Sequence, residues 1–145
     1  MIALGSDHGG FTLKQKIIQH LEAWDIAYKD LGTFDENAVD YAPIAVAVSC
    51  SVVSEESTLG ILCCGTGIGM SMAANKMKGI RAACCSDAFS AEMTRRHNDA
   101  NILCLGGRVV PEEKVEELLR VFLESPFEGG RHSRRVAQIM DLETH

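Results

Sequence analysis

The stretch GILCCGTGIGMSMAANK, residues 60–76, decides the fold of this chain. A short apolar run over residues 59–64 ends in three closely spaced glycines, Gly65, Gly67 and Gly69, and helix-forming residues follow at once. This order predicts a buried strand, a tight loop and a helix N-terminus. Because the backbone N–H groups of such a loop point outward together and the helix dipole adds positive potential, the stretch predicts an anion-binding site.

Two reactive side chains belong to this loop. Cys64 is the last residue before the glycines, and Thr66 lies among them. The loop is neither a P-loop nor a full G-x-G-x-x-G fingerprint, so no nucleotide motif explains it. Tight packing between strand and helix is an alternative explanation for the glycines. A thiol beside an anion-binding loop favours a site that reacts as well as binds.

Apolar runs and helical spacings alternate along the whole chain. We expect strands at 1–4, 27–31, 59–64, 80–85 and 102–105, and helices at 11–24, 41–53, 68–77, 88–98, 111–123 and 132–142. The strands read as apolar throughout, which indicates a parallel sheet covered on both faces. The predicted fold class is α/β: a three-layer α/β/α Rossmann-like fold with a five-stranded parallel sheet and an extra C-terminal helix. Residues 1–145 should form a single domain, and the final helix, about 131–143, should pack on a partner subunit.

The overall composition excludes several classes of protein. The chain has 145 residues, 46% of them hydrophobic, and a formal net charge of −6. The acidic balance argues against binding to nucleic acid, and no apolar run reaches the roughly 20 residues of a membrane span. Met1 leads directly into a strand pattern without the layout of a signal peptide, so we expect a cytoplasmic protein.

The chain contains six cysteines, at positions 50, 63, 64, 84, 85 and 104. Adjacent cysteines within apolar runs are typical of reduced core residues, and we expect this of all except Cys64. The sequence has no C-x-x-C, no H-E-x-x-H and no carboxylate cluster, so it predicts no metal site.

Ligands of open α/β sheets bind outside the carboxyl ends of the strands. The first expected strand leads to Asp7 and His8, and the fifth leads to Arg108. An acid and an imidazole at a strand exit suit recognition of a polar ligand. A capping aspartate and a surface histidine are the simpler alternative.

Further candidates lie near two helix ends, which we also expect close to the ligand. Arg131 and Arg135 are four residues apart and share one helical face, where their guanidinium groups suit a phosphate. A solvated face is the alternative. His97 and Asn98 close another expected helix, so His97 is either a general acid–base group or a residue that interacts with the helix dipole.

Together the motifs resemble the type B ribose-5-phosphate isomerases of the ribose and galactose isomerase family. They cover essentially the whole chain in order: SDHGGF at 6–11, DY at 40–41, CGTG through AANK at 64–76, RRHNDAN at 95–101, and GGRH with Arg135 at 129–135. The resemblance implies a cofactor-free aldose–ketose isomerase that interconverts D-ribose 5-phosphate and D-ribulose 5-phosphate through an enediolate, in the non-oxidative pentose phosphate pathway.

The resemblance also implies roles for individual residues. Cys64 would be the catalytic base, and His97, with Thr66, would assist opening of the sugar ring. The enediolate oxygen would be held by the loop, Gly65, Thr66, Gly67, Ile68 and Gly69. The remaining substrate contacts would come from Asp7, His8, Tyr41, Asn98, Arg108, Arg131 and Arg135, the three arginines and His8 holding the phosphate.

Family members are homodimers or homotetramers with sites shared between subunits, which is therefore the expected assembly. The alternative substrates within the family are allose 6-phosphate and galactose 6-phosphate, and a non-catalytic binding module is the alternative outside it.

The chain departs from the family where Ala42 separates Tyr41 from Pro43. It also has Met70 in the segment where some relatives place a glutamate base, so Cys64 is the one evident base. Cys63 should point to the other face of the strand.

Overall fold

A computed structural model describes residues 1–144 of the chain. Its centre is a five-stranded sheet in the order β2-β1-β3-β5-β4, and every neighbouring pair runs parallel. The strands are β1 (Ile2–Ser6), β2 (Tyr28–Asp30), β3 (Leu59–Cys64), β4 (Ala82–Cys84) and β5 (Ile102–Gly106). The predicted five-stranded parallel sheet is confirmed.

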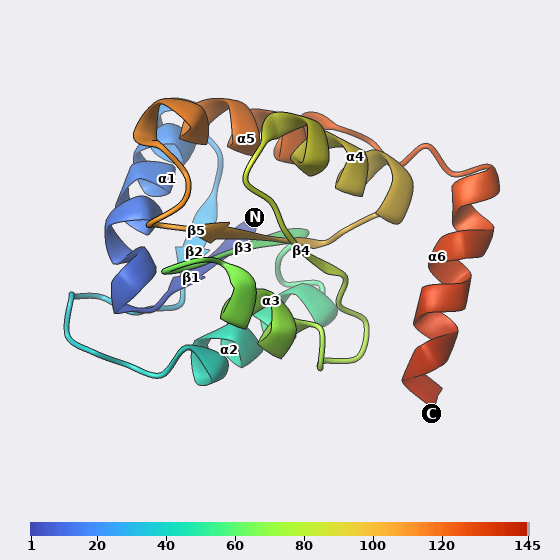
Figure 1. Cartoon of the computed structure of the whole chain (residues 1–145), viewed down its shortest axis with the longest axis horizontal. Helices are drawn as coiled ribbons and strands as arrows, with labels where there is room; N and C mark the ends of the chain where they lie inside the picture. Colours follow the sequence, from blue (N-terminus) through green and yellow to red (C-terminus); the bar gives the residue numbers. More distant parts are fainter. Residues whose placement is uncertain (145) are drawn as a thin grey trace.

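Helices cover both faces of this sheet (Figure 1). Helices α1 (Phe11–Ala23), α4 (Ala88–Asn98) and α5 (Glu112–Glu124) lie on one face, while α2 (Tyr41–Val53) and α3 (Ile68–Ala74) lie on the other. Two short 3-10 helices, η1 (His8–Gly10) and η2 (Leu142–Thr144), and α6 (Arg131–Asp141) complete the described elements. The three-layer α/β/α architecture and the extra C-terminal helix are as predicted.

The two faces of the sheet bury separate apolar clusters. Because successive strand residues point to opposite faces, Cys63 joins the cluster beneath α1, α4 and α5, and Cys64 joins the cluster beneath α2 and α3. The expectation that Cys63 faces away from Cys64 is confirmed. Strands β1, β3 and β5 are buried along nearly their whole length, as their continuous apolar sequence predicts.

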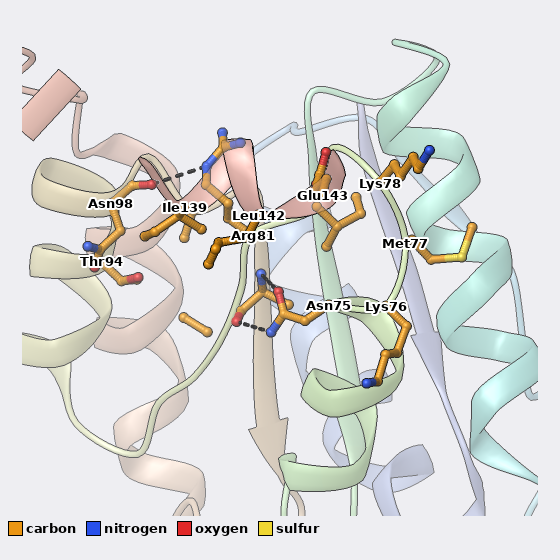
Figure 2. A pocket seen from close by; sticks show the side chains of 14 residues that line it. Asn75, Lys76, Met77, Lys78, Arg81, Thr94, Asn98, Ile139, Leu142 and Glu143 are labelled. Atoms are coloured by element: carbon orange, nitrogen blue, oxygen red, sulfur yellow. Dashed lines mark hydrogen bonds between the residues drawn. The ribbon is translucent and has the colours of Figure 1, made fainter. Parts of the chain in front are cut away.

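The expectation that all strands are apolar and covered is wrong for the two edge strands. Strand β2 is only partly buried and carries the exposed Lys29, and β4 ends in the exposed Cys84. Edge strands lack a neighbour on one side, so fewer helices cover them. On the open edge of β4, the Asn75 side chain hydrogen-bonds both backbone groups of Ala82. Its amide oxygen accepts from the Ala82 nitrogen at 2.8 Å, and its amide nitrogen donates to the Ala82 carbonyl oxygen at 2.9 Å (Figure 2).

The prediction for the cysteines needs a second correction. Cys50 and Cys84 are exposed, whereas Cys63, Cys85 and Cys104 are buried as expected. Cys50 lies on the outward side of α2, which the continuous apolar sequence of this helix does not reveal.

None of the helices over residues 1–144 combines the length and the apolar character that crossing a lipid bilayer requires.

A buried lysine on α1 anchors the loop that approaches the site. Lys14 is 1% exposed, its Nζ lies 2.7 Å from the Asp30 carboxylate, and it also donates to the Thr33 carbonyl. The paired carboxylate offsets the cost of removing the ammonium from water. This contact holds the start of the long loop between β2 and α2 against the body of the protein.

Helix α6 stands apart from the three layers (Figure 1). It contacts α4, and its end is tied to the loop before β4, where Glu143 accepts a hydrogen bond from the Gly79 nitrogen at 2.7 Å. Two apolar side chains at this end, Ile139 and Leu142, remain 46% and 67% exposed. The end of α6 therefore carries uncovered apolar residues, and packing of α6 on another subunit stays a prediction.

Candidate active site

The site is built around the loop that follows β3. The Sγ atom of Cys64 accepts a hydrogen bond from the Gly67 backbone nitrogen at 3.1 Å. Gly67 has a φ of +82°, and a Cβ placed on it would lie 2.9 Å from the carbonyl carbon of Leu105. Only glycine fits both conditions, so the loop sequence is what aims this N–H group back at the sulfur.

The segment after β5 holds this loop from the side. The Gly107 nitrogen donates to the Cys64 carbonyl at 2.8 Å, and the Arg108 nitrogen donates to the Gly65 carbonyl at 3.0 Å. A Cβ on Gly106 would come within 2.6 Å of the Thr66 carbonyl carbon, so the two loops touch backbone to backbone. The Arg108 guanidinium lies over Gly65, with Nη1 3.0 Å from the position of a Cβ there. An anion near this loop therefore meets a fixed positive charge.

Asp7 and His8 reach the same edge from β1. The Asp7 carboxylate is largely buried and accepts a hydrogen bond from the Gly10 nitrogen at 3.1 Å, so it also caps η1. The Val39 nitrogen, from the loop before α2, donates to Nδ1 of His8 at 3.3 Å. Because Nδ1 accepts this hydrogen bond, the ring proton belongs on Nε2, which is left available to a ligand.

Three further predicted residues complete this cluster. The Tyr41 ring lies against Gly69, where an added Cβ would be 2.7 Å from Cζ. The Thr66 hydroxyl oxygen accepts a hydrogen bond from the Ile68 nitrogen at 3.2 Å, and the Ile68 side chain is half exposed. One end of the sheet thus brings together ten predicted residues: Asp7, His8, Tyr41, Cys64, Gly65, Thr66, Gly67, Ile68, Gly69 and Arg108.

The other four predicted residues do not lie at this end of the sheet within the same chain. His97 and Asn98 close α4, and Arg131 and Arg135 lie on α6, at the far side of the molecule from the loop joining β5 to α5 (Figure 1). A helix that follows a parallel strand runs back toward the amino ends of the strands. Its C-terminus therefore lies opposite the ligand-binding end, and the expectation that these residues lie near the strand exits is wrong for a single chain.

His97 belongs instead to a second cluster, with His132 and Glu128. The two imidazole rings stack with centroids 4.2 Å apart and an angle of 10° between their planes. Oε1 of Glu128 lies 3.7 Å from Nε2 of His97 and 3.6 Å from Nε2 of His132. Burial lowers the pKa of His132, and His97 and Arg131 lower it further, whereas Glu128 opposes the shift.

The ligand atoms of these three side chains all lie within 4.8 Å of one another, which is a possible metal-binding distance. Nitrogen ligands, however, hold a metal in the plane of their ring, at about 2.0–2.1 Å. Two stacked, nearly parallel rings cannot both place one ion in their planes. The arrangement therefore does not suit a metal ion.

Sequence reasoning missed the contact between His97, Glu128 and His132. The three residues come from the end of α4, the segment after α5 and the first turn of α6. No spacing rule connects residues that far apart in the chain, because their contact depends on how α6 docks on α4. The histidine inside the GGRH segment was the one available signal.

A pocket of about 850 Å³ lies beside β4 and not at Cys64 (Figure 2). Asn98, Ile139 and Leu142 line one side of it, and Asn75 lines another. The Arg81 Nε donates to the Asn98 carbonyl at 3.1 Å, which fixes the end of α4 at its rim. The chemically reactive groups at Cys64 lie outside this pocket, and their chemistry, not the cavity, marks the candidate site.

The other buried thiols are poorly suited to act as bases. Burial raises the pKa of Cys63 and of Cys104 well above the usual range, and it raises the pKa of Cys85 to about 11. Such thiols stay protonated near neutral pH. At Cys64, in contrast, the Gly67 N–H group points at the sulfur.

A parallel sheet between two layers of helices defines a protein of the α/β class. The thiol and the glycine loop at the carboxyl end of this sheet suit proton transfer next to a developing negative charge. The chain matches the family model described as Ribose/Galactose Isomerase over residues 2–139, and it belongs to that family. It is 44% identical to ribose-5-phosphate isomerase B of Escherichia coli over 142 residues, which cover 98% of this chain and 95% of that protein.

Solved structures agree with this assignment. Ribose-5-phosphate isomerase B of Clostridium thermocellum is 45% identical, superposes with a TM-score of 0.97, and is matched over 99% of this chain and 97% of that one. The enzyme of Mycoplasma genitalium with bound ribulose-5-phosphate is 41% identical, with a TM-score of 0.94 and coverage of 99% of this chain and 96% of that one.

Proposed function

We propose that this chain is an aldose–ketose isomerase that interconverts D-ribose 5-phosphate and D-ribulose 5-phosphate. The single observation that carries the proposal is the Cys64 sulfur, held at 3.1 Å from the Gly67 nitrogen at the mouth of an anion-binding loop. The names of its relatives support the pentose phosphate over the hexose phosphates, and one relative has ribulose-5-phosphate bound.

Isomerisation requires three chemical steps. Ribose 5-phosphate is mostly a furanose, so its C1–O4 bond first breaks, O4 gains a proton, and the C1 hydroxyl loses one as C1=O forms. The Cys64 thiolate then removes the proton from C2, and the electrons move to the C1 oxygen to give an enediolate. The C2 hydroxyl passes its proton to the C1 oxygen, C2=O forms, and C1 takes back the proton held by the Cys64 thiol, which yields ribulose 5-phosphate. The N–H groups of the loop from Gly65 to Gly69 are placed to stabilise the enediolate oxygen.

The substrate's phosphate is held away from the reacting carbons in this proposal. His8 and Arg108 from one end of the sheet, together with Arg131 and Arg135, form its binding site. Binding energy at a remote, non-reacting phosphate positions C1 and C2 for proton transfer. Asp7, Tyr41 and Asn98 are assigned to the sugar hydroxyls, and His97, assisted by Thr66, to ring opening.

A complete site then requires two copies of the chain. Cys64 and His97 lie at opposite ends of the sheet in one subunit, so His97, Asn98, Arg131 and Arg135 are contributed by a partner. A two-fold dimer, or a tetramer built from such dimers, would form two identical sites. The uncovered apolar residues Ile139 and Leu142 on the end of α6 support this assembly, because they need cover in solution.

The decisive experiment is an isomerase assay on ribose 5-phosphate in the presence of EDTA. We expect turnover that the chelator does not reduce, and allose 6-phosphate and galactose 6-phosphate, assayed side by side, should be poorer substrates. Absence of ribose 5-phosphate turnover in the folded protein would refute the proposal, and loss of activity with EDTA would refute its cofactor-free form.

A further inference from the structure

The end of α4 fixes the backbone of His97 but leaves its ring free. Asp99, the residue after α4, adopts a φ of +48° and ends the helix. Arg95 donates to its carboxylate at 3.0 Å, and Arg81 donates to its carbonyl at 2.9 Å. These contacts hold the main chain, so something else must set the orientation of the His97 imidazole.

That orientation comes from the segment leading into α6. The Glu128 nitrogen donates to the Arg96 carbonyl at 3.0 Å, which ties this segment to α4 beside His97. The carboxylate of Glu128 then faces the edges of both imidazoles, at 3.7 Å from His97 and 3.6 Å from His132. His132 is itself largely buried, and its ring covers one face of His97.

We infer that Glu128 and His132 are positioning residues for the ring-opening step, holding the His97 imidazole by its edge and its face. The inference rests on the proposed function, because it assumes that His97 opens the sugar ring. Ring opening delivers a proton to O4 as the C1–O4 bond breaks and releases a proton from the C1 hydroxyl. An imidazolium that donates the first proton and regains the second leaves the protein unchanged.

Two stacked imidazoles and one carboxylate suit this exchange. Stacked rings disfavour two positive charges, while the nearby Glu128 carboxylate stabilises one. The charged groups around the pair are Glu128 before α6, Arg96 on α4, and Arg131 and Arg135 on α6. Arg96 contacts the other oxygen of Glu128, Oε2, at 3.8 Å and therefore moderates its charge.

The inference is tested with Glu128→Gln and His132→Gln, with Glu92→Gln as the matched control. Glu92 also pairs with Arg96, at 2.8 Å, but has no contact with the imidazole pair among the described interactions. Turnover of cyclic ribose 5-phosphate should fall about ten-fold in the first two variants, a fraction of the roughly 100- to 10,000-fold contributed by a positioned acid–base group. Glu92→Gln should keep wild-type turnover.

A second measurement separates ring opening from proton transfer. Ribulose 5-phosphate has no free hydroxyl with which to close a five-membered ring, so uptake of deuterium at its C1 from D2O reports on Cys64 alone. That uptake should change less than two-fold in Glu128→Gln and His132→Gln. An equal loss in both assays would overturn the inference, because it would mean general damage to the site.

The pH profile supplies a third measurement. Removing the carboxylate should move the alkaline fall in ribose 5-phosphate turnover to lower pH, and removing the second imidazole should move it to higher pH. Imidazole proton shifts followed by NMR without substrate should show the same opposite displacements. Identical or absent displacements would overturn the inference while leaving the proposed function intact, whereas a wild-type protein without isomerase activity would refute both.

Discussion

The sulfur of Cys64 lies 3.1 Å from the backbone nitrogen of Gly67, which donates a hydrogen bond to it. The next cysteine along the chain toward the N-terminus, Cys63, faces the opposite side of the sheet, where burial raises its pKa. Two adjacent thiols thus differ in chemistry because strand residues alternate between faces and only one of them meets the loop.

Replacing Cys64 by serine should abolish most of the isomerase activity. A serine hydroxyl is a far weaker base than a thiolate, and a positioned base contributes roughly 100- to 10,000-fold, so we expect kcat to fall about 1,000-fold. The thermal midpoint should change little. Cys50→Ser, the same exchange at an exposed position of α2, is the control for kcat. Near-normal turnover in Cys64→Ser would remove Cys64 as the base.

Gly106→Ala should damage the site without touching a reactive group. The added Cβ would lie 2.6 Å from the Thr66 carbonyl carbon and would push the β3 loop away from β5. We expect a loss of about 1–3 kcal/mol in the free energy of unfolding and a clear drop in kcat. Denaturant unfolding and steady-state kinetics measure the two effects.

The matched control for that change is Gly79→Ala. Gly79 has a φ of +86°, but the nearest atom to an added Cβ is 3.4 Å away and belongs to Val53. This variant should lose about 1 kcal/mol through backbone strain alone and retain kcat. If both variants kept kcat, the packing of β5 against the loop would have no role in catalysis.

Arg135→Ala should weaken substrate binding far more than turnover. A hydrogen bond to a charged group contributes about 1.5–3 kcal/mol, so KM for ribose 5-phosphate should rise roughly 10- to 100-fold. Arg134→Ala is the control, since Arg134 is the preceding residue on α6 and points to another side of the helix. An unchanged KM in Arg135→Ala would exclude this residue from the phosphate site.

Mixed oligomers test whether sites are shared between subunits. Cys64→Ser and His97→Asn should each be nearly inactive alone. In a shared dimer, a mixed molecule carries one site with both changes and one with neither. Equal amounts refolded together should therefore recover about a quarter of wild-type activity, since half of the dimers are mixed. No recovery, in dimers shown to have mixed, would contradict shared sites.

The stability of the protein should depend on pH through His132. Burial lowers its pKa in the folded state, so below about 6.5 the unfolded chain binds the proton more readily than the folded one. The free energy of unfolding should therefore fall as the pH drops below that value. His132→Gln should show a shallower fall. An unchanged slope in His132→Gln would contradict this.

Much of the fold could be predicted because local patterns reflect local forces. The continuous apolar run of β3 and the glycine loop that follows it lie where the sequence places them. The edge strands were read less well. Exposure of β2 and β4 depends on strand order in the sheet, which no local pattern encodes.

A buried charge escaped the sequence reading for a related reason. Lys14 lies on the same helical stripe as the buried Leu21 and Ile17, and a core predicted from apolar residues alone leaves it out. Its partner Asp30 belongs to β2, sixteen residues further along the chain. The pairing of β2 with β1 is what makes burial of the ammonium tolerable.

The sequence by itself determined the parallel α/β architecture, the glycine loop with Cys64 at its edge, and the family. These depend on periodicity, on turn chemistry and on motifs within short segments. Tertiary structure alone decided that Cys64 and His97 lie at opposite ends of one subunit, and that His97 stacks on His132 beside Glu128. The physical reason is that a helix after a parallel strand returns to the other end of the sheet, and the docking of α6 on α4 then selects which distant side chains meet.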